Sequence, residues 1–114
     1  MQGTIKLLRI YTDESAYFGD RRVYEVIAER VRDFGLEGAT VVQALFGFGR
    51  GSHERRRHVL EDEQSLVIEI IDEERRLRDF TARIVDMPGI GLVTMEAVEV
   101  LYQGPAPDGD GAPQ

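Results

Sequence analysis

The residues that offer the most chemistry lie in one polar segment, residues 49–64, with the sequence GRGSHERRRHVLEDEQ. It contains four closely spaced arginines, Arg50, Arg55, Arg56 and Arg57. Planar guanidinium groups form paired hydrogen bonds with phosphate and carboxylate groups. The segment is therefore a candidate binding site for a nucleotide phosphate, another small anion or an acidic partner. The alternative is a solvated loop or short helix whose charges pair with one another.

Three glycines, Gly47, Gly49 and Gly51, alternate directly after a predicted strand. Glycine lets a backbone approach a phosphate closely, so these positions join the candidate ligand site. A dinucleotide-binding fingerprint needs a further glycine where Ser52 stands, and the pattern fails there. A sharp departure of the chain from the sheet is the simpler account of the glycines, and both interpretations stay open.

The sequence predicts no metal site, no cofactor and no catalytic residues. The chain has no cysteine, and a separation of five residues keeps His53 and His58 off a common helical face. Nucleophile-elbow, HExxH and Ser-His-Asp patterns are all missing. We therefore expect a binding protein. The enzyme alternative is hydrolysis of a phosphate ester or acylphosphate, with Arg50 or Arg55 as the anion clamp.

The composition describes one small acidic domain. The 114 residues include 14 basic and 21 acidic side chains, a net charge of −7 that disfavours binding to nucleic acid or to anionic lipid. The absence of cysteine and of a long apolar N-terminal stretch predicts a cytoplasmic protein. We expect residues 1–102 to form the domain. Residues 103–114, rich in proline and glycine, are predicted to be a disordered tail.

Hydrophobic periodicity divides the domain into six segments in the order β-α-β-β-α-β. Strands are predicted over residues 4–12, 40–48, 65–72 and 92–102, and helices over residues 20–34 and from residue 73 to the turn at 87–91. Asp20 and Asp72 are the predicted N-caps, and Gly35 is predicted to end the first helix. This order predicts an α+β, ferredoxin-like fold with a four-stranded antiparallel sheet and two helices on one face.

The third predicted strand is apolar on both faces. Leu66, Ile68 and Ile70 share one face, whereas Val67 and Ile71 share the other. A sheet with helices on one side only would need partner subunits to cover the second apolar face, so we predict an oligomer. The alternative is that long Arg and Lys stems lie over a few exposed aliphatic side chains.

Four strings, LLRIYTDES, VYEVIAERVRDFGLEGATVVQALFGFGRG, SLVIEIIDEE and GLVTMEAVEVLY, resemble the PII-like proteins of domain-of-unknown-function family 190. The resemblance covers residues 4–102, and GATV followed by GFG is its most specific part. It implies a ferredoxin-like homotrimer, related in architecture to PII signalling proteins and CutA-type trimers. Members are often linked with fluoride-channel or transporter proteins, which implies a membrane transporter or channel as the target of residues 49–64.

The resemblance also adds two residues to the ligand site. In PII proteins, nucleotides bind in clefts between subunits, and the loop before the last strand contacts phosphate through a lysine that follows its second glycine. Here that loop is matched by Gly89 and Gly91, but Leu92 stands in place of the lysine. We therefore expect a regulatory protein for a small anionic ligand, such as a nucleotide. The further alternative is an interaction module that needs no ligand.

Overall fold

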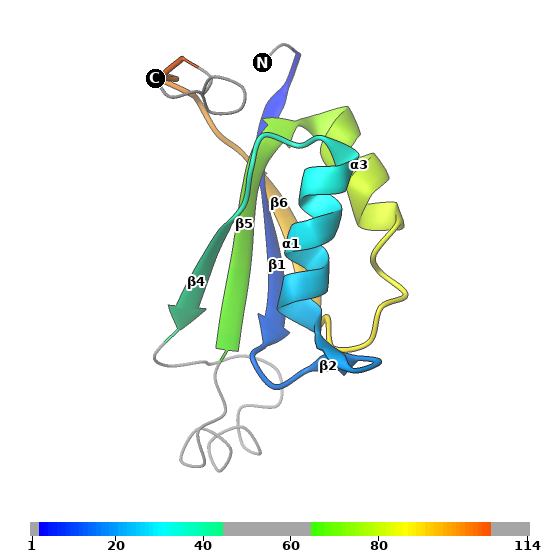
Figure 1. Ribbon diagram of the computed structural model, residues 1–114. Helices are drawn as coiled ribbons and strands as arrows, with labels where there is room; N and C mark the ends of the chain where they lie inside the picture. Colours follow the sequence, from blue (N-terminus) through cyan, green and yellow to red (C-terminus); the bar gives the residue numbers. More distant parts are fainter. Residues whose placement is uncertain (1–2, 45–64, 106–114) are drawn as a thin grey trace.

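The computed structural model describes residues 3–44 and 65–105. Figure 1 shows how their helices and strands are arranged. In chain order these are β1 (Ile5–Asp13), β2 (Tyr17–Phe18), β3 (Arg21–Arg22), α1 (Val23–Phe34), β4 (Thr40–Ala44), β5 (Ser65–Glu73), α3 (Glu74–Ala82) and β6 (Leu92–Ala97).

The main sheet has the strand order β4-β5-β1-β6, and every neighbouring pair is antiparallel. Strand β1 lies in the interior and pairs with β5 along its whole length, from Ile5 opposite Glu73 to Asp13 opposite Ser65. Both helices cover the same face (Figure 1). The predicted α+β fold class, with the ferredoxin-like order of strands and helices, is confirmed.

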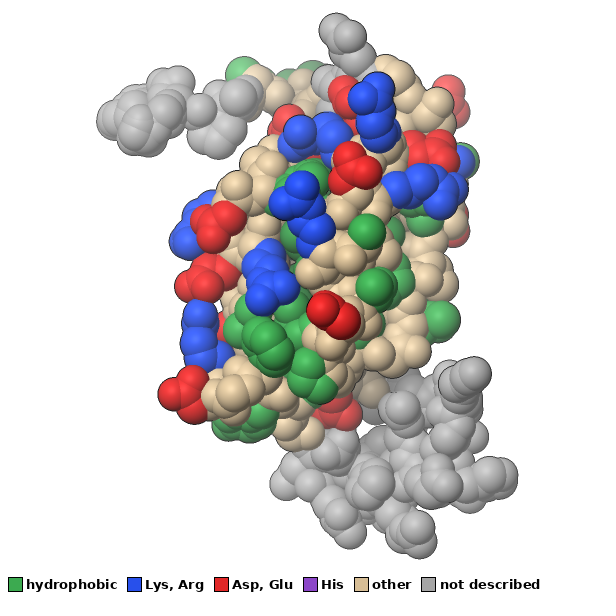
Figure 2. Space-filling model, turned by 90° about the vertical axis from the view of Figure 1, so that its right-hand side faces the viewer, with side chains coloured by type: hydrophobic (Ala, Val, Ile, Leu, Met, Phe, Trp, Pro, Cys, Tyr) green, Lys and Arg blue, Asp and Glu red, His purple; other side chains and the backbone are tan. Residues whose placement is uncertain are grey.

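The core lies between the two helices and the sheet. Alternate residues of β1 and β5 point into it, as the period of a strand requires. Its buried side chains include Leu8, Ile10, Ile68 and Ile70 from the strands and Ile27, Val31, Leu77 and Phe80 from the helices. Charged side chains of both signs cover much of the side that lies to the right in Figure 1 (Figure 2).

The prediction that Asp20 caps the first helix is wrong. Residues around Gly19 and Asp20 instead form the turn of a small hairpin, in which Tyr17 pairs with Arg22. A two-residue turn that begins with a glycine at positive φ is a favoured hairpin connection, and Gly19 has φ 69°. The N-cap position of α1 falls on Arg22, whose side chain makes no capping hydrogen bond.

The predicted end of the first helix is confirmed at Gly35. This residue is left-handed, with φ 86°, and its N–H donates to the carbonyl oxygens of Val31 and Arg32. A left-handed residue at this position donates hydrogen bonds to carbonyl oxygens of the last turn that have no partner within the helix.

The second predicted cap, Asp72, is also wrong, because Glu73 occupies the N-cap position of α3. Asp72 belongs to β5, and only 3% of its surface is exposed. Its carboxylate accepts hydrogen bonds from the backbone N–H of Glu37 at 3.1 Å, the backbone N–H of Glu73 at 2.7 Å and Nε of Arg76 at 3.1 Å. Asp72 therefore joins the segment after α1 to the first turn of α3.

The last strand ends at Ala97, earlier than the predicted residue 102. Among the described residues β6 lies beside β1, which begins at Ile5; the Val98 N–H still donates to the carbonyl oxygen of Ile5 at 3.5 Å, and beyond Val98 this strand offers no further partner. The described chain continues without regular structure, and Leu101 and Tyr102 are 88% and 82% exposed. The predicted strand at 40–48 is described only as far as Ala44, and the predicted tail at 103–114 only as far as residue 105. The remaining residues of both segments lie outside the described ranges.

Candidate functional site

Residues 45–64, which include the arginine-rich segment, connect two strand ends that lie at the same end of the sheet. Ala44, the last residue of β4, pairs with Ser65, the first residue of β5, and Ser65 also faces Asp13. The residues between them are outside the described ones, and so are seven of the predicted ligand-binding residues: Gly47, Gly49, Arg50, Gly51, Arg55, Arg56 and Arg57. Their role stays a prediction, but the fold places the strand ends that flank residues 45–64 side by side.

The loop with Gly89 and Gly91 reaches the same end of the sheet. The Gly91 N–H donates to the carbonyl oxygen of Tyr11 at 2.8 Å, and Oγ1 of the buried Thr12 donates to the carbonyl oxygen of Gly89 at 2.8 Å. The fold therefore brings this loop and the strand ends that flank residues 45–64 to the C-terminal end of β1. We call this region the loop end.

Gly89 is required for packing. It has φ 89°, and a Cβ added to it would lie 2.6 Å from Cβ of Ala16 and 3.3 Å from Cγ2 of Val23. Real Cβ atoms do not approach other atoms so closely. The N–H of Gly91 is already donated to Tyr11, so it is not available to a phosphate. Close packing thus accounts for Gly89, and a ligand role for either glycine stays a prediction.

The β2-β3 hairpin adds exposed aromatic and basic side chains to the loop end. The guanidinium of Arg22 lies 5.1 Å from the ring centroid of Tyr17, and Arg22 Nη1 donates to the carbonyl oxygen of Glu14 at 2.7 Å. Tyr17 and Phe18 are both exposed. We did not predict this cation–π arrangement from the sequence. The pair Gly19-Asp20 is nevertheless typical of a hairpin turn, and it stands between two aromatic and two basic residues.

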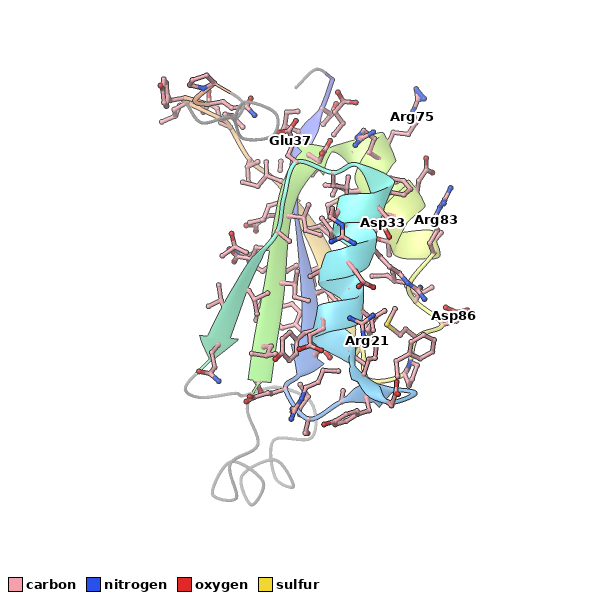
Figure 3. All side chains as sticks on the ribbon, in the orientation of Figure 1. Arg21, Asp33, Glu37, Arg75, Arg83 and Asp86 are labelled. Carbon is pink, nitrogen blue, oxygen red and sulfur yellow. The ribbon has the colours of Figure 1, made fainter. Side chains whose placement is uncertain are left out.

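The second arginine of the hairpin is neutralised locally. Nη1 of Arg21 lies 2.9 Å from Oε1 of Glu29 on α1 (Figure 3). This hydrogen bond holds the pKa of the Glu29 carboxyl below its ordinary value. Because both side chains are well exposed, the pair adds little stability. Arg21 is therefore a weak candidate for contact with an anionic ligand.

The sheet face opposite the helices, which we call the open face, carries apolar side chains from all four strands beside polar and charged ones. Its apolar side chains are Ile5, Leu7, Tyr11, Val42, Val67, Ile71 and Leu92. Val42, Ile71 and Leu92 are exposed. At its centre Arg9 pairs with Glu69 and Glu96, each at 3.1 Å, and these carboxylates raise the pKa of Arg9 above its ordinary value. The predicted two-sided apolar pattern is confirmed for Val67 and Ile71.

The described part of the chain shows neither a metal site nor a membrane-spanning helix. In residues 3–44 and 65–105, no three Asp or Glu side chains come together in a way that could hold a metal ion. No helix in these ranges has the length and apolar character needed to cross a membrane.

A family model, DUF190, described as an uncharacterized ACR, matches residues 5–100. The chain belongs to the DUF190 family. The resemblance seen in the sequence is thereby confirmed, and the match includes both the loop end and the arginine-rich segment of this DUF190 protein.

Two similar proteins of Aquifex aeolicus (strain VF5) are each described as a UPF0166 protein. One is 41% identical over 99 residues, which cover 85% of this chain and 93% of the relative. The other is 30% identical over 88 residues, which cover 69% of this chain and 92% of the relative. Neither name states a ligand, a partner or a reaction, so the function of this DUF190 protein must be inferred from its own residues.

Proposed function

We propose that this DUF190 protein is a PII-like regulatory protein and not an enzyme. In this proposal it forms a homotrimer and binds a small anion, such as a nucleotide, in clefts between subunits. It contacts a target protein, such as a membrane transporter or channel, through residues 49–64. The main support is the loop end, where the strand ends that flank residues 45–64 lie beside β1 and the Gly89–Gly91 loop is hydrogen-bonded to β1. Residues 49–64 contain four arginines, and a guanidinium group is planar and forms paired hydrogen bonds with anions.

The open face supports assembly. It carries apolar side chains without helices over them, and the chain that follows β6 adds the exposed side chains of Leu101 and Tyr102. Apolar side chains that contact no other part of a chain are typical of surfaces that bind another subunit. A second and third copy are the occupants that we propose for these surfaces.

Light scattering coupled to size exclusion is expected to give about three times the 12.9 kDa monomer mass at micromolar concentration. Ile71→Lys should shift the protein toward monomer, because it places a charge in the middle of the open face. The control is Val85→Lys, at an exposed valine outside the sheet, which should leave the mass unchanged. A wild-type monomer at these concentrations would contradict the proposed assembly.

A thermal-shift and calorimetric screen of adenine nucleotides, cyclic nucleotides, bicarbonate, phosphate and fluoride is expected to give at least one saturable ligand. Replacing Arg55, Arg56 and Arg57 together by alanine should weaken its binding at least tenfold, because each charge-assisted hydrogen bond contributes roughly 1.5–3 kcal/mol. Calorimetric titration of both proteins measures the change.

The matched control carries the same loss of three positive charges on the helices: Arg32, Arg75 and Arg78, all exposed, are replaced by alanine. Its affinity should stay within about twofold of the wild type. Equal weakening in both triple variants would show that only net charge matters. Turnover of a phosphate ester or acylphosphate would favour the hydrolase, and the absence of any ligand would favour a ligand-independent interaction module.

A further inference from the structure

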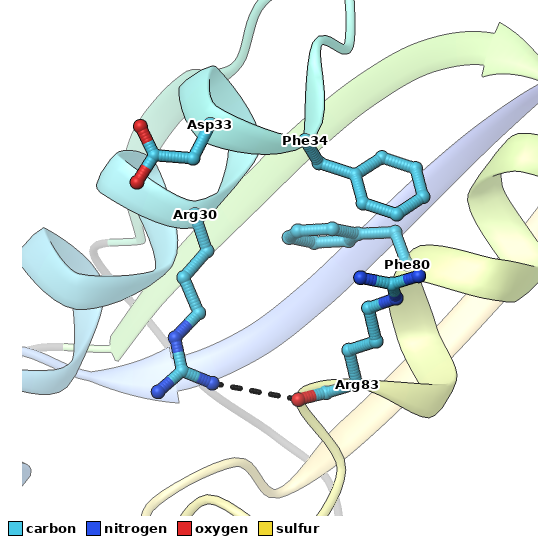
Figure 4. Close-up of a pocket in the computed structure, with 5 residues that line it drawn as sticks. All are labelled: Arg30, Asp33, Phe34, Phe80 and Arg83. Atoms are coloured by element: carbon cyan, nitrogen blue, oxygen red, sulfur yellow. Dashed lines mark hydrogen bonds between the residues drawn. The ribbon is translucent and has the colours of Figure 1, made fainter.

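A pocket of about 290 Å³ opens on the helix side of the sheet, between the C-terminal parts of α1 and α3. Arg30, Asp33 and Phe34 line it from α1, and Phe80 and Arg83 line it from the end of α3 (Figure 4). None of these residues belongs to the loop end or to the open face. Subunits that pack on the open face would lie on the other side of the sheet, so the pocket is a site separate from the one proposed above.

The wall of the pocket is apolar and fixed in place by the core. The rings of Phe34 and Phe80 meet edge to face, with centroids 5.6 Å apart and an angle of 65° between their planes. Phe80 is only 1% exposed, and the half-buried Phe34 packs against the same core. Paired aromatic rings at the edge of a packed core form a rigid surface for another flat apolar group.

The two arginines of the pocket are also held in position. The guanidinium of Arg83 lies 4.9 Å from the ring centroid of Phe34, and that of Arg30 lies 5.6 Å from the ring centroid of Phe18. Arg30 Nη1 also donates to the carbonyl oxygen of Arg83 at 3.4 Å (Figure 4). Side chains that are already ordered lose less conformational entropy when they bind a ligand.

Neither Arg30 nor Arg83 has an ion-pair partner in the part of the chain that the structure describes. By contrast, Arg9, Arg21 and Arg76 there each pair with a carboxylate within 3.1 Å. A guanidinium carries five N–H donors, so cation–π contacts and one long hydrogen bond leave most of them available. In a chain of net charge −7, two adjacent arginines without carboxylate partners are suited to an external anion.

Asp33 limits the charge of that anion. Asp33 also lines the pocket, and its carboxylate lies 3.4 Å from Nε of Arg32, which does not line it. The lining therefore combines two guanidinium groups with one carboxylate, which favours a ligand with one negative charge over a polyphosphate. The volume of about 290 Å³ is just below the roughly 300–1,000 Å³ typical of ligand pockets, which suits a single ring.

We propose that this pocket binds a small monoanion in which a carboxylate is attached to one aromatic ring. The carboxylate accepts hydrogen bonds from Arg30 and Arg83, and the ring packs against Phe34, which the buried ring of Phe80 supports from behind. This pairing uses both the positive charge and the apolar wall that the pocket presents.

The test is a titration of the ¹⁵N-labelled full-length protein with benzoate, followed by amide chemical shifts. Saturable shifts are expected at the pocket residues, with affinity about tenfold weaker in Arg83→Gln and in Arg30→Gln. Benzamide, a neutral molecule of nearly the same shape, should bind at least tenfold more weakly than benzoate. If Arg83→Gln fails to fold, as its spectrum would show, Arg30→Gln gives the same comparison.

The matched control is Arg75→Gln, which removes one positive charge from an arginine that extends outward from α3 (Figure 3) and does not line the pocket. Its affinity for benzoate should stay within about twofold of the wild type. The proposal is overturned if benzoate shifts do not saturate at millimolar concentration, if benzamide binds equally well, or if Arg75→Gln weakens binding as much as Arg83→Gln.

Discussion

Gly89→Ala is expected to lower the free energy of unfolding by about 3 kcal/mol. A non-glycine residue at a φ near 89° costs about 1–2 kcal/mol. The new methyl group would also meet Cβ of Ala16 at 2.6 Å, and forcing extra atoms into a packed site costs roughly 1–3 kcal/mol. Ala16 cannot move freely, because its carbonyl oxygen accepts the N–H of Val23 at the start of α1. Urea unfolding followed by circular dichroism measures the loss.

The control for this variant is Gly19→Ala. Gly19 also has positive φ, but nothing lies within 4 Å of its added Cβ, so only the conformational cost of about 1 kcal/mol remains. Equal losses in the two variants would contradict the packing role of Gly89. A Gly89→Ala protein of normal stability that no longer binds the anion would instead assign this glycine to the ligand site.

Asp72→Ala is expected to cost about 3 kcal/mol, the second large effect. The variant removes the carboxylate that accepts hydrogen bonds from the backbone N–H of Glu37, the backbone N–H of Glu73 and Nε of Arg76. Loss of a buried ionic partner typically costs about 3–5 kcal/mol, and partial exposure of Arg76 places this case at the lower end. The same urea unfolding assay measures it.

Asp72→Asn should also destabilise the protein, because an amide presents N–H₂ where the second carboxylate oxygen accepts a hydrogen bond. Asp79→Ala, at an exposed carboxylate on α3, is the control and should change stability by less than about 0.5 kcal/mol. If Asp72→Ala lost no more than Asp79→Ala, the joining role of Asp72 would be wrong.

The hydrophobic pattern was sufficient to predict the strands of the main sheet, both helices and their order, but not the β2-β3 hairpin. Periodicity reports which side of an element is buried, and the side chains of Ile68 and Leu77 lie where it places them. Two of the errors fall at helix N-termini, where several local structures compete for the same residues. Asp20 was assigned to a cap but lies in a hairpin turn, and one partner of Asp72 is the backbone of Glu37, which is distant in the sequence.

The candidate sites were less predictable than the fold. The sequence placed Gly89 in the ligand site, but no local pattern shows that Ala16 lies directly against it. The pocket between the helices was not predicted, because the hydrophobic pattern assigns both Phe34 and Phe80 to the core. Such a pocket depends on how two helices meet, and that geometry is not contained in the periodicity of either one.

The pairing of Ala44 with Ser65 has a consequence for how this family can diversify. Once the two strand ends are held together by the sheet, the entropy of closing the intervening connection grows only slowly with its length, by about 0.6 kcal/mol for each doubling. Insertions, deletions and charge changes between these two residues are therefore nearly neutral for the stability of the scaffold. Substitutions can therefore change the side chains of that connection from one family member to another while the underlying sheet stays the same.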